Sequence, residues 1–133
     1  EYACRAGTDT AYSFGPTVST TQVNFFEPGN NDCFEGSVPV GSFQSNAWGI
    51  HDMHGNVWEI CQDWYSKDYY KRSTKIDPLG PNSGREKVCR GGCWCSENNH
   101  IRSASRGEVT TENIGSNLGF RLVLQNIGQK RKK

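Results

Sequence analysis

Two carboxylates stand on either side of a tight turn near the middle of the chain. Asp52 and Glu59 flank the dipeptide Gly55-Asn56, and aromatic and apolar residues surround them. A Gly-Asn pair favours a tight backbone turn, so carboxylate oxygens and backbone carbonyls can converge on one hard cation. The alternative is a buried hairpin whose acids simply face water.

A second set of oxygen donors lies in a long polar segment. Residues 9–37 are rich in Thr, Ser, Asn, Gly and Pro, with a short apolar island at residues 23–26. A structureless loop of this length is uncommon in a compact domain, so something besides an apolar core must hold it. Asn24 and Asp32 supply oxygen atoms around a turn at residues 28–31, which suits a bound cation. The alternative is an ordinary polar loop.

Six cysteines are the other reactive side chains. They match neither a disulfide scaffold nor paired zinc-ligand spacing: Cys4, Cys33, Cys61, Cys89, Cys93 and Cys95. Cys93 and Cys95 flank Trp94 in a predicted strand, where both thiols would point to one face. Along an extended chain they are expected to be too far apart for an unstrained disulfide. The alternative for each is a small, semi-buried thiol.

Composition limits the class of protein. The 133 residues suffice for one modest domain, and the net charge of +1 creates no global field for nucleic acid or an anionic membrane. No apolar run is long enough for a membrane span. A hydrophobic content of 34% and 15 glycines indicate a loop-rich, aromatic-cored domain rather than a helical bundle. Without an initiator Met the chain is expected to be truncated, so its compartment stays open.

Short elements must position these groups. Residues 1–8 are typical of a helix end that stops at Gly7. Strands are expected at 38–43, at 87–94 with a bulge at the double glycine, and at 118–124; 69–84 and 95–117 are expected to be irregular. Trp58, Trp94 and Phe120 are expected in the core rather than against a ligand. Residues 125–133 are predicted to be a basic, flexible tail, not a nucleic-acid arm.

Five motifs occur in order along the chain. They are Glu1-Tyr2-Ala3-Cys4-Arg5-Ala6-Gly7-Thr8, Pro39-Val40-Gly41-Ser42-Phe43, Gly55-Asn56-Val57-Trp58-Glu59, Arg90-Gly91-Gly92 and Gly119-Phe120-Arg121. Together they resemble the C-terminal part of a formylglycine-generating enzyme (sulfatase-modifying factor) domain over residues 1–124. The resemblance implies an α+β, loop-rich fold with a C-type-lectin-like arrangement, whose opening strands and first helix would precede Glu1.

The resemblance also implies two structural calcium sites. The first would use Asn24, the Phe25 carbonyl, Asp32 and the Phe34 carbonyl; the second would use Asp52, the carbonyls of Gly55 and Val57, and Glu59. The side-chain donors in this set are the same residues that their oxygen chemistry singles out. Calcium would stabilise loops that have too few apolar contacts to keep them in place.

The family's enzymes bind copper(I) through two cysteines five positions apart, shortly after Arg-Gly-Gly, and use oxygen to convert a substrate cysteine to formylglycine. Counting from Arg90 places those positions at Ser96 and Ile101, which offer no thiolate, the soft ligand that copper(I) prefers. A shift of one residue gives Cys95 and His100 with the right spacing. We therefore expect no formylglycine formation, with a Cys95–His100 copper site as the alternative.

Other relatives lack the copper cysteines, and some are variable proteins whose asparagine codons are altered at adenines by retroelements. Residues 93–117 contain residue types that such changes produce, among scaffold-like residues such as Arg102 and Arg106. The expected binding face comprises Cys93, Cys95, Ser96, Asn98, His100, Ser105, Gly107 and Val109. Glu97, Glu108 and Glu112 do not arise by that route, so ordinary drift on a surface loop is the alternative.

Three functions remain open from the sequence. The first is a non-catalytic, calcium-stabilised domain that binds an unknown protein or peptide ligand. The second is a copper-dependent oxidase that acts on a sulfatase cysteine. The third is an accessory domain of a larger protein. None of them calls for a nucleic-acid partner or a membrane span.

Overall fold

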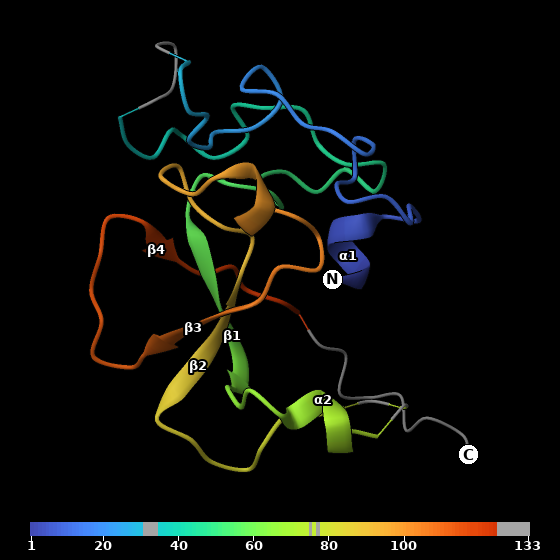
Figure 1. Cartoon of the computed structure of the whole chain (residues 1–133), viewed down its shortest axis with the longest axis vertical. Helices are drawn as coiled ribbons and strands as arrows, with labels where there is room; N and C mark the ends of the chain where they lie inside the picture. Colours follow the sequence, from blue (N-terminus) through green and yellow to red (C-terminus); the bar gives the residue numbers. More distant parts are fainter. Residues whose placement is uncertain (31–34, 75, 77, 125–133) are drawn as a thin grey trace.

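The computed structural model describes residues 1–30, 35–74, 76 and 78–124, and it shows a small sheet beneath a large irregular region (Figure 1). The elements are α1 (Tyr2–Arg5), β1 (Trp58–Trp64), α2 (Tyr69–Arg72), β2 (Glu86–Arg90), the 3-10 turn η1 (Asn98–His100), β3 (Gly107–Thr110) and β4 (Leu118–Gly119). The expected loop-rich α+β fold is confirmed. Within these residues no helix has the length and apolar character needed to cross a membrane.

The four strands form one mixed sheet in the order β3-β2-β1-β4. Strand β1 runs antiparallel to β2 and parallel to β4, and β2 runs antiparallel to β3. Glu59 lies opposite Arg90, and Trp58 lies beside Leu118. The register of β1 on β2 shifts between Ile60 and Trp64, so the strand is bulged. This sheet positions Trp58 and the segment that follows β2.

Two local predictions agree with the structure. Helix α1 ends where Ala6 takes a left-handed φ of 47° and Gly7 follows with φ of 95°. Gly55 and Asn56 both have positive φ, 71° and 64°, which is the conformation that a Gly-Asn turn provides. The turn does not close a hairpin, however, because β1 pairs with β2 and β4 rather than with the residues before it.

The strand expected at residues 38–43 is wrong. The side chain of Asn56 accepts from the Val38 N–H (2.9 Å) and donates to the Val38 carbonyl (3.2 Å), so it takes the groups that a ladder would use. The Gly41 N–H donates to Asp52 Oδ2 at 2.7 Å. A long-range polar contact therefore replaces strand pairing here.

The other strand boundaries also differ from expectation. Strand β2 stops at Arg90 because Gly91 and Gly92, with φ of 90° and 74°, turn the chain away. Residues 93–95 are consequently not a strand. The last strand covers only Leu118–Gly119. Segments predicted to be irregular contain α2 and β3.

Burial corrects the list of expected core aromatics. Phe120 is 70% exposed, so its placement in the core is wrong. Trp58 and Trp94 are half-buried. The buried cluster lies instead in the irregular half and comprises Tyr12, Val23, Phe25 and Ile101, with Ala11, Phe14 and Val18 packed against it. The long polar loop therefore does have an apolar core of its own.

Candidate ligand pocket and metal positions

A cavity of about 750 Å³ lies on the sheet beside the segment that follows η1. Its walls come from the four strands, from η1 and from the loops on either side of β3. The lining residues are Trp58, Cys89, Asn99, His100, Arg102, Ala104, Ser105, Arg106, Gly107, Glu108, Val109, Asn113, Asn117 and Leu118.

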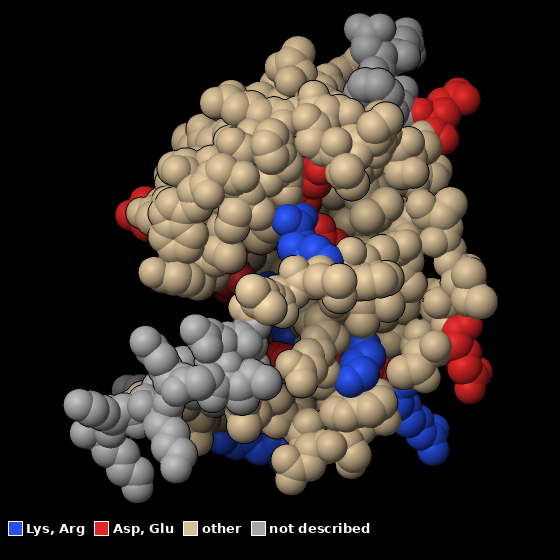
Figure 2. Space-filling view, turned by 180° about the vertical axis from the view of Figure 1, so that it is seen from behind, with Lys and Arg blue, Asp and Glu red and all other residues tan. Residues whose placement is uncertain are grey.

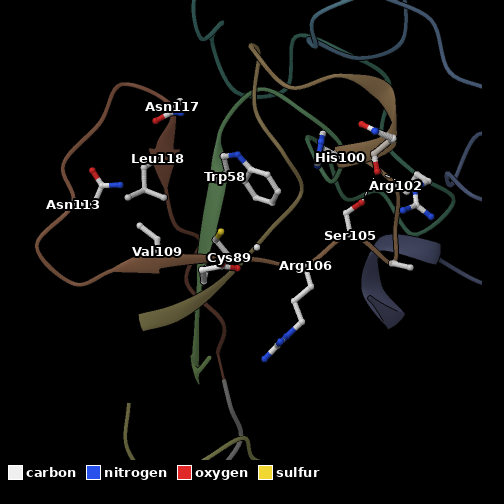
Figure 3. Close-up of a pocket in the computed structure, with 14 residues that line it drawn as sticks. Trp58, Cys89, His100, Arg102, Ser105, Arg106, Val109, Asn113, Asn117 and Leu118 are labelled. Carbon is white, nitrogen blue, oxygen red and sulfur yellow. Dashed lines mark hydrogen bonds between the residues drawn. The ribbon is translucent and has the colours of Figure 1, made fainter. Parts of the chain in front are cut away.

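The Trp58 ring lies between two groups of the residues that line this cavity (Figure 3). Val109 and Leu118 lie to one side of it, and His100 and Ser105 lie to the other. The Trp58 ring, Val109 and Leu118 form the apolar part of a lining in which polar groups predominate. The side chain of Arg106 points away from these groups in the same view.

Hydrogen bonds from arginines fix the wall of the cavity. Arg90 Nη1 donates to the carbonyls of Ala104 (3.1 Å) and Ser105 (2.6 Å), which joins the end of β2 to the loop before β3. Arg102 Nε donates to the Asn99 carbonyl at 2.9 Å. Arg106 lies over the Tyr65 ring, 4.3 Å from its centroid. Guanidinium contacts from β2 and from the loop itself therefore hold the loop that lines the cavity.

The charged groups of the lining are Arg102, Arg106 and Glu108. Because the Arg106 side chain points away, one cation and one anion remain at the cavity, Arg102 and Glu108. The molecular face in Figure 2 shows acidic and basic atoms intermixed among many uncharged ones, with no broad patch of one sign.

The structure divides the predicted binding face. His100, Ser105, Gly107 and Val109 line the cavity. The others lie outside its lining: Cys93 is buried, Ser96 is half-buried, and Cys95 and Asn98 are exposed. Sequence reasoning treated Trp58, Arg102 and Arg106 as core or scaffold, yet all three line the cavity. Their contribution depends on strand pairing between distant segments, which no local pattern reveals.

The two positions aligned with the copper cysteines have other roles here. Ser96 Oγ accepts from the Cys93 N–H at 3.2 Å. Ile101 is 0% exposed and belongs to the buried cluster of the irregular half. Cys95 Sγ lies 3.2 Å from Cys93 Sγ, so the expectation that these two thiols are far apart is wrong. Among the described residues no group of three or more His, Cys, Asp and Glu is arranged to hold a metal.

The first predicted calcium position contains an unsatisfied oxygen. Asn24 is 1% exposed, and its Nδ2 donates to the Gly36 carbonyl at 2.9 Å. Its Oδ1 is buried and has no hydrogen-bond partner within the described chain. A buried acceptor without a partner is costly, and a calcium ion would satisfy it. Phe25 follows directly and is buried, whereas Asp32 and Phe34 lie outside the described residues.

At the second predicted position three of the four residues line one cavity of about 230 Å³: Asp52, Val57 and Glu59. Gly55 forms the adjacent turn and is not part of the lining. Both carboxylate oxygens of Glu59 accept from the Arg121 guanidinium, which also donates to the His51 carbonyl at 3.1 Å. The hydrogen bond to Glu59 raises the pKa of Arg121. A cationic group therefore already neutralises Glu59.

Comparison with known proteins identifies the family. The sulfatase-modifying factor enzyme 1-like domain matches residues 1–126. The chain belongs to this family. The resemblance that the five ordered motifs carry is thereby confirmed.

Individual relatives agree with that assignment. The chain is 36% identical over 121 residues to serine/threonine-protein kinase pkn1 of Chlamydia caviae, covering 90% of this chain and 18% of that protein. It is 43% identical over 88 residues to the formylglycine-generating enzyme of Streptomyces coelicolor, covering 64% and 28%. The structure of Treponema denticola variable protein 1 matches with a TM-score of 0.76 and 28% identity, covering 90% and 42%. The chain thus spans less than half the length of each.

Proposed function

We propose that this chain is a non-catalytic ligand-binding domain of the sulfatase-modifying factor family, with the cavity around Trp58 as its binding site. The observation that carries the proposal is the cavity itself. Its volume of about 750 Å³ falls within the range of about 300–1,000 Å³ that is typical of ligand pockets. Four residues of the binding face predicted from sequence belong to its lining: His100, Ser105, Gly107 and Val109.

The chemistry of the copper positions supports a non-catalytic role. Ile101 is an alkyl side chain inside the apolar core, and Ser96 has its hydroxyl bonded to the backbone of Cys93. Neither offers the soft ligand that copper(I) requires. His100 lines the cavity, whereas Cys95 lies outside the lining and against Cys93.

The lining suggests a peptide segment as ligand. Trp58, Val109 and Leu118 suit an apolar or aromatic anchor, and Arg102 suits an acidic neighbour of that anchor. The Treponema denticola relative is described as a variable protein, and its structure resembles this one. We extend that property to this chain as a proposal: substitutions at lining positions of β3 and the loop before it would change the ligand without changing the fold.

Calcium is proposed as a structural ion at the first position, through Asn24 Oδ1 and the Phe25 carbonyl. The partnerless buried oxygen of Asn24 supports it. At the second position calcium would have to share Glu59 with Arg121, so the residues there fit the ion less well. The ion would supply charge neutralisation and cross-linking of loops and no reactive group.

The binding proposal is tested with a random peptide library displayed on phage and selected on the full chain. Enriched peptides should bind Trp58→Ala and Arg102→Glu at least about tenfold more weakly than the unaltered chain, about 1.4 kcal/mol. Trp48→Ala is the matched control, because Trp48 is 46% exposed, contacts Tyr2 and lies outside the cavity lining. Peptides that bind all four proteins equally would show that the cavity is not the site.

The catalytic alternative is tested directly. The full chain is loaded with copper(I), supplied with oxygen and a sulfatase-type cysteine peptide, and the peptide is analysed by mass spectrometry for formylglycine. We expect none. Formylglycine that disappears in Cys95→Ser would overturn the proposal and assign Cys95 as the metal ligand.

A further inference from the structure

We propose that Cys93 and Cys95 form a thiol–disulfide exchange site that external disulfides oxidise to an intramolecular disulfide. Their sulfur atoms lie 3.2 Å apart. A disulfide bond needs them to approach to about 2.0 Å, a change that side-chain rotation and a small backbone adjustment supply. This site is separate from the binding function proposed above and does not depend on it.

The backbone after β2 brings the two thiols together. Gly91 and Gly92 have positive φ, and a Cβ on Gly92 would lie 2.4 Å from Ile101 Cγ2, so only glycine fits there. The Ser96 N–H then donates to the Cys93 carbonyl at 2.9 Å, which closes a turn around Trp94. In a turn, unlike in a strand, residues two apart can meet through their side chains.

The two thiols differ in access. Cys93 is 1% exposed, whereas Cys95 is exposed. An external disulfide can therefore reach Cys95 first, and Cys93 stands behind it as the resolving thiol. The side-chain amide of Asn117 lies 3.8 Å from Cys93 Sγ and 4.0 Å from Cys95 Sγ. Asn117 also lines the ligand cavity, so the thiol pair adjoins that cavity.

Of the described thiols only that of Cys95 is exposed, and Cys61 is half-buried. Cys4 and Cys89 are buried. Burial is the main reason that the pKa of Cys89 rises to about 11. Burial and the neighbouring Cys93 raise the pKa of Cys95, and the Asn117 amide partly opposes them. Exchange at Cys95 is therefore expected to accelerate as the pH rises, because the thiolate is the nucleophile.

The reaction is balanced with an external disulfide as the oxidant. The Cys95 thiolate attacks one sulfur of that disulfide, whose S–S bond breaks and releases one thiolate. The Cys93 thiolate then attacks the Cys95 sulfur and expels the second thiolate. The two cysteines lose two electrons and two protons, and the external disulfide gains both and becomes two thiols.

Oxidised and reduced glutathione are the probe. The reduced full chain is equilibrated with them, unreacted thiols are alkylated, and the chain is digested with trypsin. Cleavage after Arg90 and Arg102 yields a fragment that contains Cys93 and Cys95 and no other cysteine. The expected fragment is two hydrogens lighter than its reduced form and carries no alkyl group. A fragment with two alkyl groups at every glutathione ratio would overturn the proposal.

Three variants assign the roles. Cys93→Ser should retain a glutathione adduct on Cys95, and Cys95→Ser should show neither the adduct nor the mass loss at the same exposure time. Cys61→Ser is the control and should oxidise the fragment as the unaltered chain does, since the Cys61 thiol donates to the Glu59 carbonyl and to neither thiol of the pair. Adducts that persist equally on the unaltered chain and Cys93→Ser would contradict resolution by Cys93.

The reaction in denaturant separates the fold from the sequence spacing. The equilibrium constant for forming the disulfide should be at least about tenfold larger in the folded chain, about 30 mV for this two-electron couple. Equal constants in the folded and denatured chain would show that the observed juxtaposition contributes nothing, and would overturn the proposal.

Discussion

Asn56 joins three other segments of the chain by hydrogen bonds from its backbone and its side chain. Its N–H donates to the Asn24 carbonyl at 2.8 Å, and its carbonyl accepts from the Trp94 N–H at 2.8 Å. Its side chain meanwhile bonds both backbone groups of Val38. Because Asn56 is 3% exposed, these groups have no access to water, and losing the side chain would leave buried partners unsatisfied. The hydrogen bond from the Asn56 N–H therefore fixes the backbone of Asn24, the proposed calcium ligand.

The backbone of Asn24 also lies too close to Gly55 for a side chain to fit there. A Cβ there would lie 2.2 Å from the Asn24 carbonyl oxygen, and φ is +71°. Gly55→Ala should therefore lower the free energy of unfolding by more than about 3 kcal/mol, since strain and a backbone clash add. Urea denaturation measures the change.

Gly49→Ala is the matched control for that substitution. Gly49 has φ of +74°, and a Cβ on it would meet nothing within 4 Å, so only the left-handed backbone cost of about 1–2 kcal/mol applies. Equal losses in the two variants would mean that the Asn24 contact is not a constraint.

At this scale the sequence predicts what is local. A Gly-Asn pair favours a tight turn by itself, so the turn at residues 55–56 was predictable from the sequence. The hydrogen bonds between Asn56 and Val38, eighteen positions away, were not predictable, because neither residue type indicates its partner. The unexpected contact between Cys93 and Cys95 likewise depends on a turn that the double glycine starts.

Among the elements, β4 ends early for a reason that lies in β1. Arg121 bonds the Glu59 carboxylate and the carbonyls of His51 and Asp52, which draws the chain away from the sheet after Gly119. The apolar residues Leu122 and Val123, which made the segment resemble a strand, are exposed. Strand β3 was not predicted, because its sequence is short and largely polar. Only its pairing with β2 defines it.

His54 joins elements that share no sheet. It is 3% exposed, its Nδ1 lies 2.7 Å from the Ile101 carbonyl, and its Nε2 accepts from the Ser13 N–H at 3.1 Å. A nitrogen that accepts must be unprotonated, so the folded chain holds the neutral ring with its proton on Nδ1. Burial lowers the pKa of His54 below its ordinary value of 6.5, and the bond to Ile101 partly offsets this.

This pKa shift predicts a loss of stability in mild acid. Below a pH of about 6.5 the unfolded chain binds a proton at His54 that the folded chain does not, so the free energy of unfolding falls as the pH decreases toward the folded-state pKa. Above that range the contribution is constant. Urea denaturation across this pH range should show a shallower dependence for His54→Gln than for the exposed control His100→Gln. Parallel curves for the two variants would contradict the role of His54.

The described chain consists mainly of a sheet that carries the cavity around Trp58 and of an irregular half that lies over one end of that sheet (Figure 1). Ile101 links the two, since it follows η1 and inserts into the core of Tyr12, Val23 and Phe25. The sequence identified the family and the loop-rich fold because ordered motifs mark both. The cavity was only partly foreseeable, since its walls are assembled from four strands and from the loops on either side of β3.

Calcium is expected to stabilise this assembly through the irregular half. An ion that binds only the folded chain raises its stability by about 2.7 kcal/mol at a hundredfold excess over Kd. Removing calcium with EGTA should therefore lower the Tm of the full chain, and restoring calcium should recover it. Asn24→Ala should abolish the response, because the buried Oδ1 is the proposed ligand.

Two further variants decide which position the ion uses. Glu97→Ala, at an exposed residue outside both positions, should keep the full response to calcium. Glu59→Ala should lower the Tm more than Glu97→Ala in either condition, because it also removes the ion pair with Arg121. If Glu59→Ala retains the calcium-dependent rise, Arg121 alone neutralises the second position and the ion acts at Asn24. If the unaltered chain melts at the same temperature with calcium and with EGTA, neither position binds calcium, and the buried oxygen of Asn24 is an uncompensated cost of the fold.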